Sequence, residues 1–186
     1  MQLNKFDIFP TEIISFQFNI EEIQPLIDEI SKNKKKIKQT SDFHKSVGGV
    51  GKYYTDHANP TKLYEYEKIM MMISNYFINN NKTFNVVNYW SAIYFENSIH
   101  ETHNHVNFIA EKGHNYSSVL YLSNIGGTKF FSSNNTSSAI DVTIPSKVGK
   151  IIFFPANLFH SGINNEKGER IIISSNIGIY DARNNS

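Results

Sequence analysis

The chain has 186 residues, 40% of them hydrophobic and 13% aromatic, and a formal net charge of +1. This length and composition predict a single globular domain over 1–186, with a helical support region at 1–83 and a β-rich core at 84–180. The small net charge gives no reason to expect a polyanionic partner, so nucleic acid is not an expected ligand. The sequence has no cysteine, which excludes disulfides, thiolate metal sites and cysteine nucleophiles.

No stretch approaches the roughly 20 apolar residues that cross a bilayer, so no membrane partner is expected. The opening residues MQLNKFDIFP lack the basic and then apolar segments of a secretory signal, and a cytoplasmic location is therefore expected. The abundance of asparagine, lysine and isoleucine is typical of an AT-rich bacterial or viral genome. If a phage encodes the chain, the expected location is the host cytoplasm.

Two segments of the support region have helical periodicity. Apolar residues recur at three- and four-residue spacing in Ile20–Lys32, and Asn19 is placed as the N-cap. The segment Thr61–Phe77 repeats this pattern, and Thr61 is in position to cap it. The lysines between 34 and 38 follow the first helix and are expected to be solvent-exposed charges at its carboxyl end.

After residue 83, short runs rich in β-branched and aromatic residues replace the helical pattern. Turn signals such as Gly126-Gly127 and Pro145-Ser146 separate these runs. Many short strands at such spacing predict an antiparallel sandwich or barrel, and eight of them favour a jelly roll, also called a double-stranded β-helix. The two helices would cover the outer face of one sheet. The expected strands are 85–95, 101–109, 116–123, 128–132, 140–144, 149–154, 158–163 and 170–179.

A His-x-His motif lies in the second of these expected strands. Because a strand points residues i and i+2 to the same face, His103 and His105 would project together, about 6–7 Å apart. Two imidazoles so placed can bind one metal ion. For an isolated motif of this kind, the alternative is that the two histidines are ordinary polar residues facing solvent. Glu101 lies on the same face by the same alternation.

Two residues of the C-terminal half strengthen the case for a binding site. His160 follows Pro155 by five residues, beside the apolar Phe159. Arg170 opens an isoleucine-rich strand and is one of only two arginines in the chain, against sixteen lysines. An arginine at that position favours a planar, bidentate contact with an anion. A salt bridge, for example to Glu169, is the alternative.

Several residues recur in an order and spacing more specific than any single motif. They are Trp90, Tyr94, His103, His105, Ser117, Tyr121, Leu122, Gly126, Gly127, Gly149, Phe154, Pro155, His160, Arg170 and Asn176. Their order resembles the signature of the 2-oxoglutarate/iron(II) oxygenase superfamily, most nearly a branch common in bacteria and phages, and the opening Asp7–Thr11 is similar to the start of that branch. It resembles prolyl-4-hydroxylase catalytic domains more distantly. The resemblance spans nearly the whole chain.

The resemblance implies an enzyme whose catalytic iron(II) is bound by His103, His105 and His160. The usual ligand set is two histidines and one carboxylate, and here His105 stands at the carboxylate position. A third neutral imidazole leaves the metal centre more positive by one charge. Glu101 stays open as a neighbour of the metal site or as a substitute ligand.

The resemblance also implies 2-oxoglutarate as cosubstrate and dioxygen as oxidant. Arg170 would bind the distal carboxylate of 2-oxoglutarate, Tyr121 would hydrogen-bond the same carboxylate, and Tyr94 would line the cosubstrate pocket. A buried anion of this kind requires a charged, hydrogen-bonding partner. Ile172 departs from the pattern because a hydroxyl residue at this position often assists cosubstrate binding. The implied activity is a dioxygenase that hydroxylates an unactivated C–H bond in an amino-acid, peptidyl or other small-molecule substrate.

Two other functions are compatible with the residues. A three-histidine, cupin-like metalloenzyme would bind iron, manganese or zinc without 2-oxoglutarate; His105 favours it, and Arg170 and Tyr121 argue against it. A non-enzymatic β-sandwich that binds a carbohydrate or protein would leave the histidines incidental. The segment 108–115 is interpreted as a loop at the rim of the site, where His114 and, nearby, His100 could contact substrate.

Overall fold

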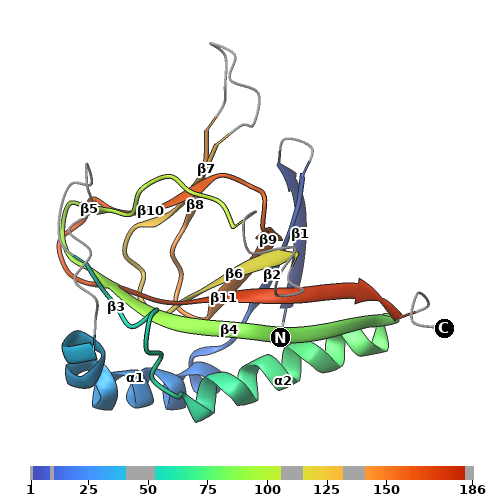
Figure 1. The fold of residues 1–186 in the computed structure, drawn as a ribbon, viewed down its shortest axis with the longest axis horizontal. Helices are drawn as coiled ribbons and strands as arrows, with labels where there is room; N and C mark the ends of the chain where they lie inside the picture. Colours follow the sequence, from blue (N-terminus) through green and yellow to red (C-terminus); the bar gives the residue numbers. More distant parts are fainter. Residues whose placement is uncertain (1, 9–10, 41–52, 106–114, 132–140, 183–186) are drawn as a thin grey trace.

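The structure is a computed structural model, and it describes residues 2–8, 11–40, 53–105, 115–131 and 141–182. These residues form two helices and two antiparallel sheets (Figure 1). The helices are α1 (Ile20–Thr40) and α2 (Tyr64–Asn79). The large sheet consists, in spatial order, of β1 (Gln2–Ile8), β2 (Thr11–Gln17), β9 (Lys150–Pro155), β6 (Tyr116–Tyr121), β11 (Arg170–Asp181), β4 (Lys82–Tyr94) and β3 (Tyr53–Thr55). The small sheet consists of β5 (Ser98–Ile99), β10 (His160–Asn164), β7 (Gly127–Phe130) and β8 (Val142–Pro145).

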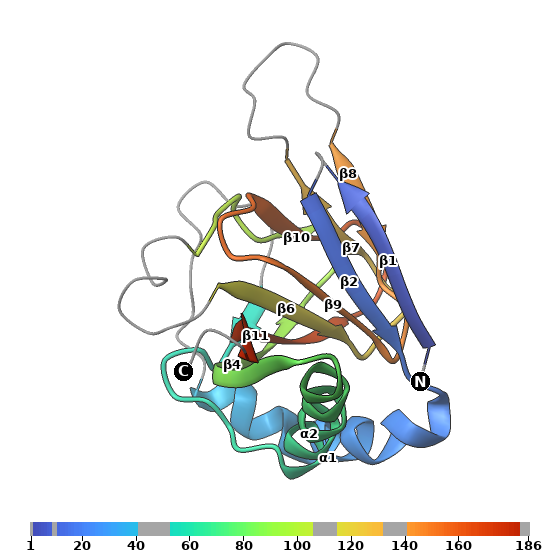
Figure 2. The ribbon, with the colours of Figure 1, turned by 90° about the vertical axis from the view of Figure 1, so that its right-hand side faces the viewer.

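The molecule has three layers, with the large sheet in the middle. Both helices pack on its outer face and the small sheet lies over its inner face (Figures 1 and 2). Alternation along each strand divides the core accordingly. Ile173 of β11 faces the helices with Ile73 and Phe77 of α2, whereas Ile172 faces the small sheet with Phe130 and Phe154. The expected double-stranded β-helix with helices on one sheet is confirmed.

The helical predictions are correct in place and wrong in detail. Helix α1 continues through the lysine-rich segment because Ile30 and Ile37, two turns apart, are both buried against the sheet. Of the lysines expected to be solvent-exposed, Lys35 and Lys36 are exposed, whereas Lys34 and Lys38 are half-buried. Thr61 does not cap α2: Leu63 occupies the N-cap position, and the Thr61 side chain is buried. Neither helix in the described part of the chain combines the length and apolar character that a bilayer crossing requires.

Three strands of the large sheet lie where the sequence predicts mainly helix. Strand β2 is buried on both faces, so its run of Ile13, Ile14 and Phe16 does not alternate, and periodicity gives no strand signal. Strand β3 has three residues. The expected strand at 101–109 is also wrong for its described part, because His103 makes only an isolated bridge with His160 there. Residues 106–109 lie outside the described residues.

Candidate metal centre and anion pocket

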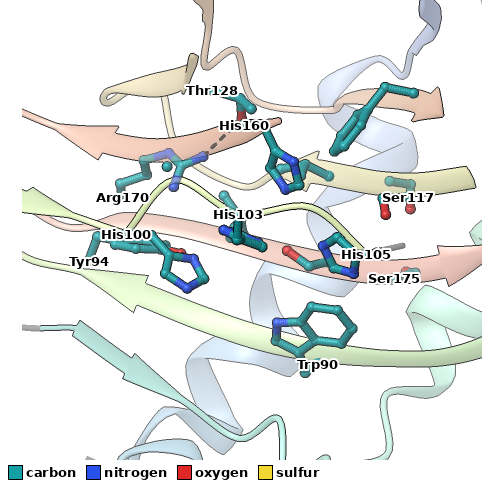
Figure 3. A pocket seen from close by; sticks show the side chains of 16 residues that line it. Trp90, Tyr94, His100, His103, His105, Ser117, Thr128, His160, Arg170 and Ser175 are labelled. Carbon is teal, nitrogen blue, oxygen red and sulfur yellow. Dashed lines mark hydrogen bonds between the residues drawn. The ribbon is translucent and has the colours of Figure 1, made fainter. Parts of the chain in front are cut away.

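The three candidate metal ligands come from two segments joined by an antiparallel bridge, and one of these segments is β10 of the small sheet. The backbone of His103 exchanges two hydrogen bonds with His160 (N···O 3.0 and 2.9 Å), and the His105 amide donates to the carbonyl of Ala156 at 2.7 Å. These bonds hold the two segments in place without a continuous strand. One ligand atom from each histidine lies within 4.8 Å of the others, and the rings point toward one another (Figure 3). The group can therefore hold one metal ion.

The ring orientations leave nitrogen lone pairs for a metal. The Nδ1 of His103 lies 2.7 Å from the carbonyl oxygen of Glu101, and the Nδ1 of His160 lies 3.0 Å from that of Leu158. A carbonyl can only accept, so each Nδ1 carries the proton and each Nε2 is a free acceptor. Burial, and next the proximity of His103, lowers the pKa of His160 well below 6.5, and burial also lowers the pKa of His103. Both imidazoles are therefore neutral at pH 7, as metal binding requires.

Glu101 does not join this group. Among the described residues, the side chains whose ligand atoms cluster are the three histidines alone. The Glu101 side chain is exposed, and its contact with His103 is made by its backbone carbonyl. The alternation that placed Glu101 beside His103 and His105 requires a regular strand, and this segment is not one.

Arg170 lies at one end of the cavity that the histidines line, and its side chain is fully buried. Its Nε donates to Ser146 Oγ at 3.4 Å and its Nη2 donates to Thr128 Oγ1 at 3.3 Å, whereas Nη1 has no hydrogen-bond partner among the described residues. The guanidinium carbon lies 4.8 Å from the ring centre of Tyr94. A buried cation held only by neutral groups is costly. This arrangement can bind an anion.

The alternative ion pair between Arg170 and Glu169 is wrong. Glu169 points away from the cavity and pairs instead with Lys34 and Lys38 of α1. The two neighbouring residues therefore lie on different sides of the large sheet. Glu169 links helix α1 to the start of β11 by ion pairs, and Arg170 faces the space between the sheets.

The two expected tyrosines flank the guanidinium. Tyr121 donates a hydrogen bond to Thr128 Oγ1 at 2.8 Å, so Thr128 stands between Tyr121 and Arg170. Burial raises the pKa of Tyr121 to about 12 and also raises that of Tyr94, which keeps both phenols neutral donors. Tyr94 Oη lies 3.3 Å from Nδ1 of His100, which brings His100 into the cavity as well.

Gly162 keeps space open beside Arg170. A Cβ at this position would lie 2.9 Å from Nη1 of Arg170 and 3.3 Å from Oη of Tyr94. The absent side chain therefore leaves room at the guanidinium nitrogen that has no partner. The sequence did not indicate Gly162 or Thr128, since each contributes through position and no motif marks it, and it indicated Ser146 only as part of a turn. The expected rim loop lies outside the described residues, apart from Asn115.

No protein-family model matches the chain, and no curated protein sequence matches it. Solved structures do. SnoN, a non-haem α-ketoglutarate-dependent epimerase from nogalamycin biosynthesis, matches with a TM-score of 0.64 and 14% identity over 91% of this chain and 78% of its own. A Pseudomonas putida prolyl-4-hydroxylase matches with a TM-score of 0.61 and 12% identity over 95% and 91%. The chain has the fold of 2-oxoglutarate/iron(II) oxygenases.

Two of the matched structures contain ligands. SnoN has been solved with Fe³⁺, α-ketoglutarate and nogalamycin RO. HygX from Streptomyces hygroscopicus, solved with nickel, 2-oxoglutarate and hygromycin B, matches with a TM-score of 0.54 and 10% identity over 90% of this chain and 83% of its own. In this chain a three-histidine group stands where such folds usually carry two histidines and a carboxylate.

Proposed function

We propose that the protein is an iron(II)- and 2-oxoglutarate-dependent dioxygenase. One observation carries this proposal: a single cavity contains both a group of three histidines and a buried arginine with a donor that has no partner among the described residues. A metal alone would need no arginine, and an anion alone would need no histidine cluster. A ligand that chelates a metal at one end and carries a carboxylate at the other fits both features.

The metal ligands in this proposal are His103, His105 and His160. With three neutral ligands, the full +2 charge of iron(II) is left for the cosubstrate to neutralise. 2-Oxoglutarate is a dianion, so its binding would lower the combined charge of iron(II) and the Arg170 guanidinium from +3 to +1, which the low dielectric of a buried site favours. The chemistry of this donor set is therefore compatible with 2-oxoglutarate.

Arg170 would bind the distal carboxylate of 2-oxoglutarate, through Nη1 and a second guanidinium nitrogen. Thr128 can donate a further hydrogen bond, and Tyr94 packs against the guanidinium and limits its movement. When bound, iron and 2-oxoglutarate supply the oxidation of an unactivated C–H bond by dioxygen, with succinate and carbon dioxide as coproducts. The protein orients both groups and keeps water out of the cavity.

The test is cosubstrate turnover by the purified protein. Protein loaded with iron(II) and 2-oxoglutarate under anaerobic conditions should consume 2-oxoglutarate and release succinate once air is admitted. The His160→Ala variant should lose both the metal and the turnover. Stoichiometric metal without any 2-oxoglutarate binding would favour a cupin-like metalloenzyme instead. Absence of stoichiometric metal in the wild-type protein would favour a non-enzymatic binding module.

A further inference from the structure

The inner face of the large sheet is ordered in rows, because β4, β11 and β6 are paired in register. Side chains that alternate on each strand share this face, and among them Tyr94, Trp90, Arg170, Ile172, Ser174, Val119 and Ser117 line the cavity. Arginine and tyrosine occupy one end of this face, and uncharged amide and hydroxyl groups occupy the other. From the first end to the other, the rows are Tyr94 with Arg170; Ala92 with Ile172 and Tyr121; Trp90 with Ser174 and Val119; Asn88 with Asn176 and Ser117.

The histidine group lies between these two ends (Figure 3). His105 stacks on the Trp90 ring with 6.2 Å between ring centres, and His160 packs on Phe154, which pairs with Ser117. Asn176 lies six positions after Arg170 on β11, or about 20 Å along the strand. 2-Oxoglutarate has a chain of only five carbons and cannot extend from the metal to both ends. The row of Ser117 and Asn176 is therefore left for another ligand.

This last row contains polar atoms without partners. Ser117 Oγ and Asn176 Oδ1 are buried, and neither has a hydrogen-bond partner among the described residues. Asn176 is held in place by its other amide atom, because Nδ2 donates to Asn88 Oδ1 at 2.9 Å. Buried polar atoms left unpaired are costly, so two of them opposite each other on paired strands indicate a ligand that satisfies both.

A backbone irregularity lies directly beside this row. The register between β11 and β4 shifts after Asn176, so that Val87 of β4 has no counterpart on β11. Bulges of this kind re-aim side chains and are frequent next to active sites. Here the bulge lies immediately beyond Asn176 and Asn88, and pairing resumes with Ile177 opposite Val86.

We propose that Ser117 and Asn176 bind a neutral amide group of the substrate. The inference rests on the proposed function, since bound iron and 2-oxoglutarate define which end of the cavity remains open. An amide matches the pair because its N–H can donate to Asn176 Oδ1 and its carbonyl can accept from the Ser117 hydroxyl. A substrate carboxylate would face the Asn176 oxygen, and a substrate ammonium would have no carboxylate to neutralise it among the described residues of the cavity.

The test compares four small probes, propionamide, propionate, propylammonium and 1,2-propanediol, on protein loaded anaerobically with iron(II) and 2-oxoglutarate. Dissociation constants come from ligand-observed NMR titrations. The wild-type protein should bind propionamide most tightly, and Ser117→Ala should weaken that binding about 3- to 10-fold, as expected for one neutral hydrogen bond. Asn176→Asp should shift the preference to propylammonium. Ser91→Ala is the control, because its hydroxyl is equally buried and without a partner but lies on the helix-facing side of β4.

The outcomes separate this inference from the proposed function. Normal metal and 2-oxoglutarate binding with no preference for propionamide, or with no effect of Ser117→Ala, overturns the inference alone. Equal binding of 1,2-propanediol overturns the amide assignment in favour of a hydroxyl-bearing substrate. If metal or 2-oxoglutarate fails to bind while propionamide binding still depends on Ser117, the proposed function fails and the inference stands. If circular dichroism shows that Asn176→Asp does not fold, the effect of Ser117→Ala on propionamide binding alone tests the inference.

Discussion

Arg170 is a buried cation whose hydrogen-bond donors are only partly satisfied. It is the largest fully buried side chain in the described part of the chain, and Ser146 and Thr128 satisfy only part of its donor capacity. Lysine at this position would keep the charge but lose the planar fork that contacts a carboxylate in two places. We expect Arg170→Lys to weaken 2-oxoglutarate binding roughly 10- to 100-fold, the equivalent of a charge-assisted hydrogen bond of about 1.5–3 kcal/mol.

Calorimetric titration of 2-oxoglutarate into metal-loaded protein measures this effect. Tyr121→Phe is the matched comparison and should weaken binding less, because Tyr121 reaches the guanidinium only through Thr128. Wild-type affinity in Arg170→Lys would contradict the anion pocket and would favour a metalloenzyme that does not use 2-oxoglutarate.

Gly162 gives a second prediction at the scale of one residue. The methyl group of Gly162→Ala would lie 2.9 Å from Arg170 Nη1 and 3.3 Å from Tyr94 Oη, the space proposed for the cosubstrate carboxylate. We expect this variant to bind metal normally and to bind 2-oxoglutarate at least about 10-fold more weakly, as expected for the loss of about 1.4 kcal/mol. Metal analysis measures the metal content, and calorimetry on the same sample measures the affinity for 2-oxoglutarate. Loss of metal as well would show that Gly162 supports the histidine group instead.

At the scale of elements, the sequence was sufficient where turn signals delimit a β-branched run. Strands β4, β6 and β11 were predicted within a few residues because their turn signals and β-branched runs are clear. Strand β2 was not, since burial on both faces removes the alternation on which such predictions depend. The histidines were predicted to meet because of strand alternation, whereas they meet through an isolated bridge between segments distant in sequence.

The partners of Arg170 also could not be predicted from the sequence. Its identity as a scarce arginine at the head of a strand was visible in the sequence, but Thr128, Ser146 and Gly162 come from other strands and loops. Their roles follow from the pairing of β7 with β10 and with β8, which no local pattern specifies. Spacing along one strand can therefore predict which residues carry the chemistry, while the groups that orient them depend on the tertiary structure.

The contact between α1 and the turn before β11 supports a prediction about these elements. Burial alone would raise the pKa of Glu169, but hydrogen bonds from Lys34 and Lys38 lower it overall. All three side chains are partly exposed, so solvent screens the interaction strongly. We expect Glu169→Gln to lower the free energy of unfolding by no more than about 1 kcal/mol, and by less in 1 M salt. Urea unfolding at both salt concentrations tests this, with the exposed Lys35→Gln as control; a loss that does not decrease with salt would contradict it.

For the whole molecule, the cavity joins the two sheets of the sandwich. His160 belongs to β10 of the small sheet, whereas Arg170 belongs to β11 of the large sheet. A metal and cosubstrate that bridge these residues would therefore bind the folded protein and not the unfolded chain. Such binding adds stability in proportion to the logarithm of ligand concentration over the dissociation constant. The same cavity, without a metal, makes stability depend on pH.

The buried histidines should make the metal-free protein less stable in mild acid. Burial lowers the pKa of His160 well below 6.5 and also lowers that of His103, so the unfolded chain takes up protons near pH 6.5 that the folded protein does not. Stability is thus fully present above about pH 6.5 and falls as the pH decreases, by at most about 1.4 kcal/mol per pH unit for each such histidine. Between pH 7.5 and 5.5 most carboxylates stay ionised, which isolates the histidine contribution. Urea unfolding of the metal-free wild-type protein and of His160→Gln measures the free energy of unfolding across this window. The decrease in this free energy between pH 7.5 and 5.5 should be smaller in the variant. Identical losses would show that His160 is protonated in the folded state, and a protonated imidazole could not bind a metal at that pH.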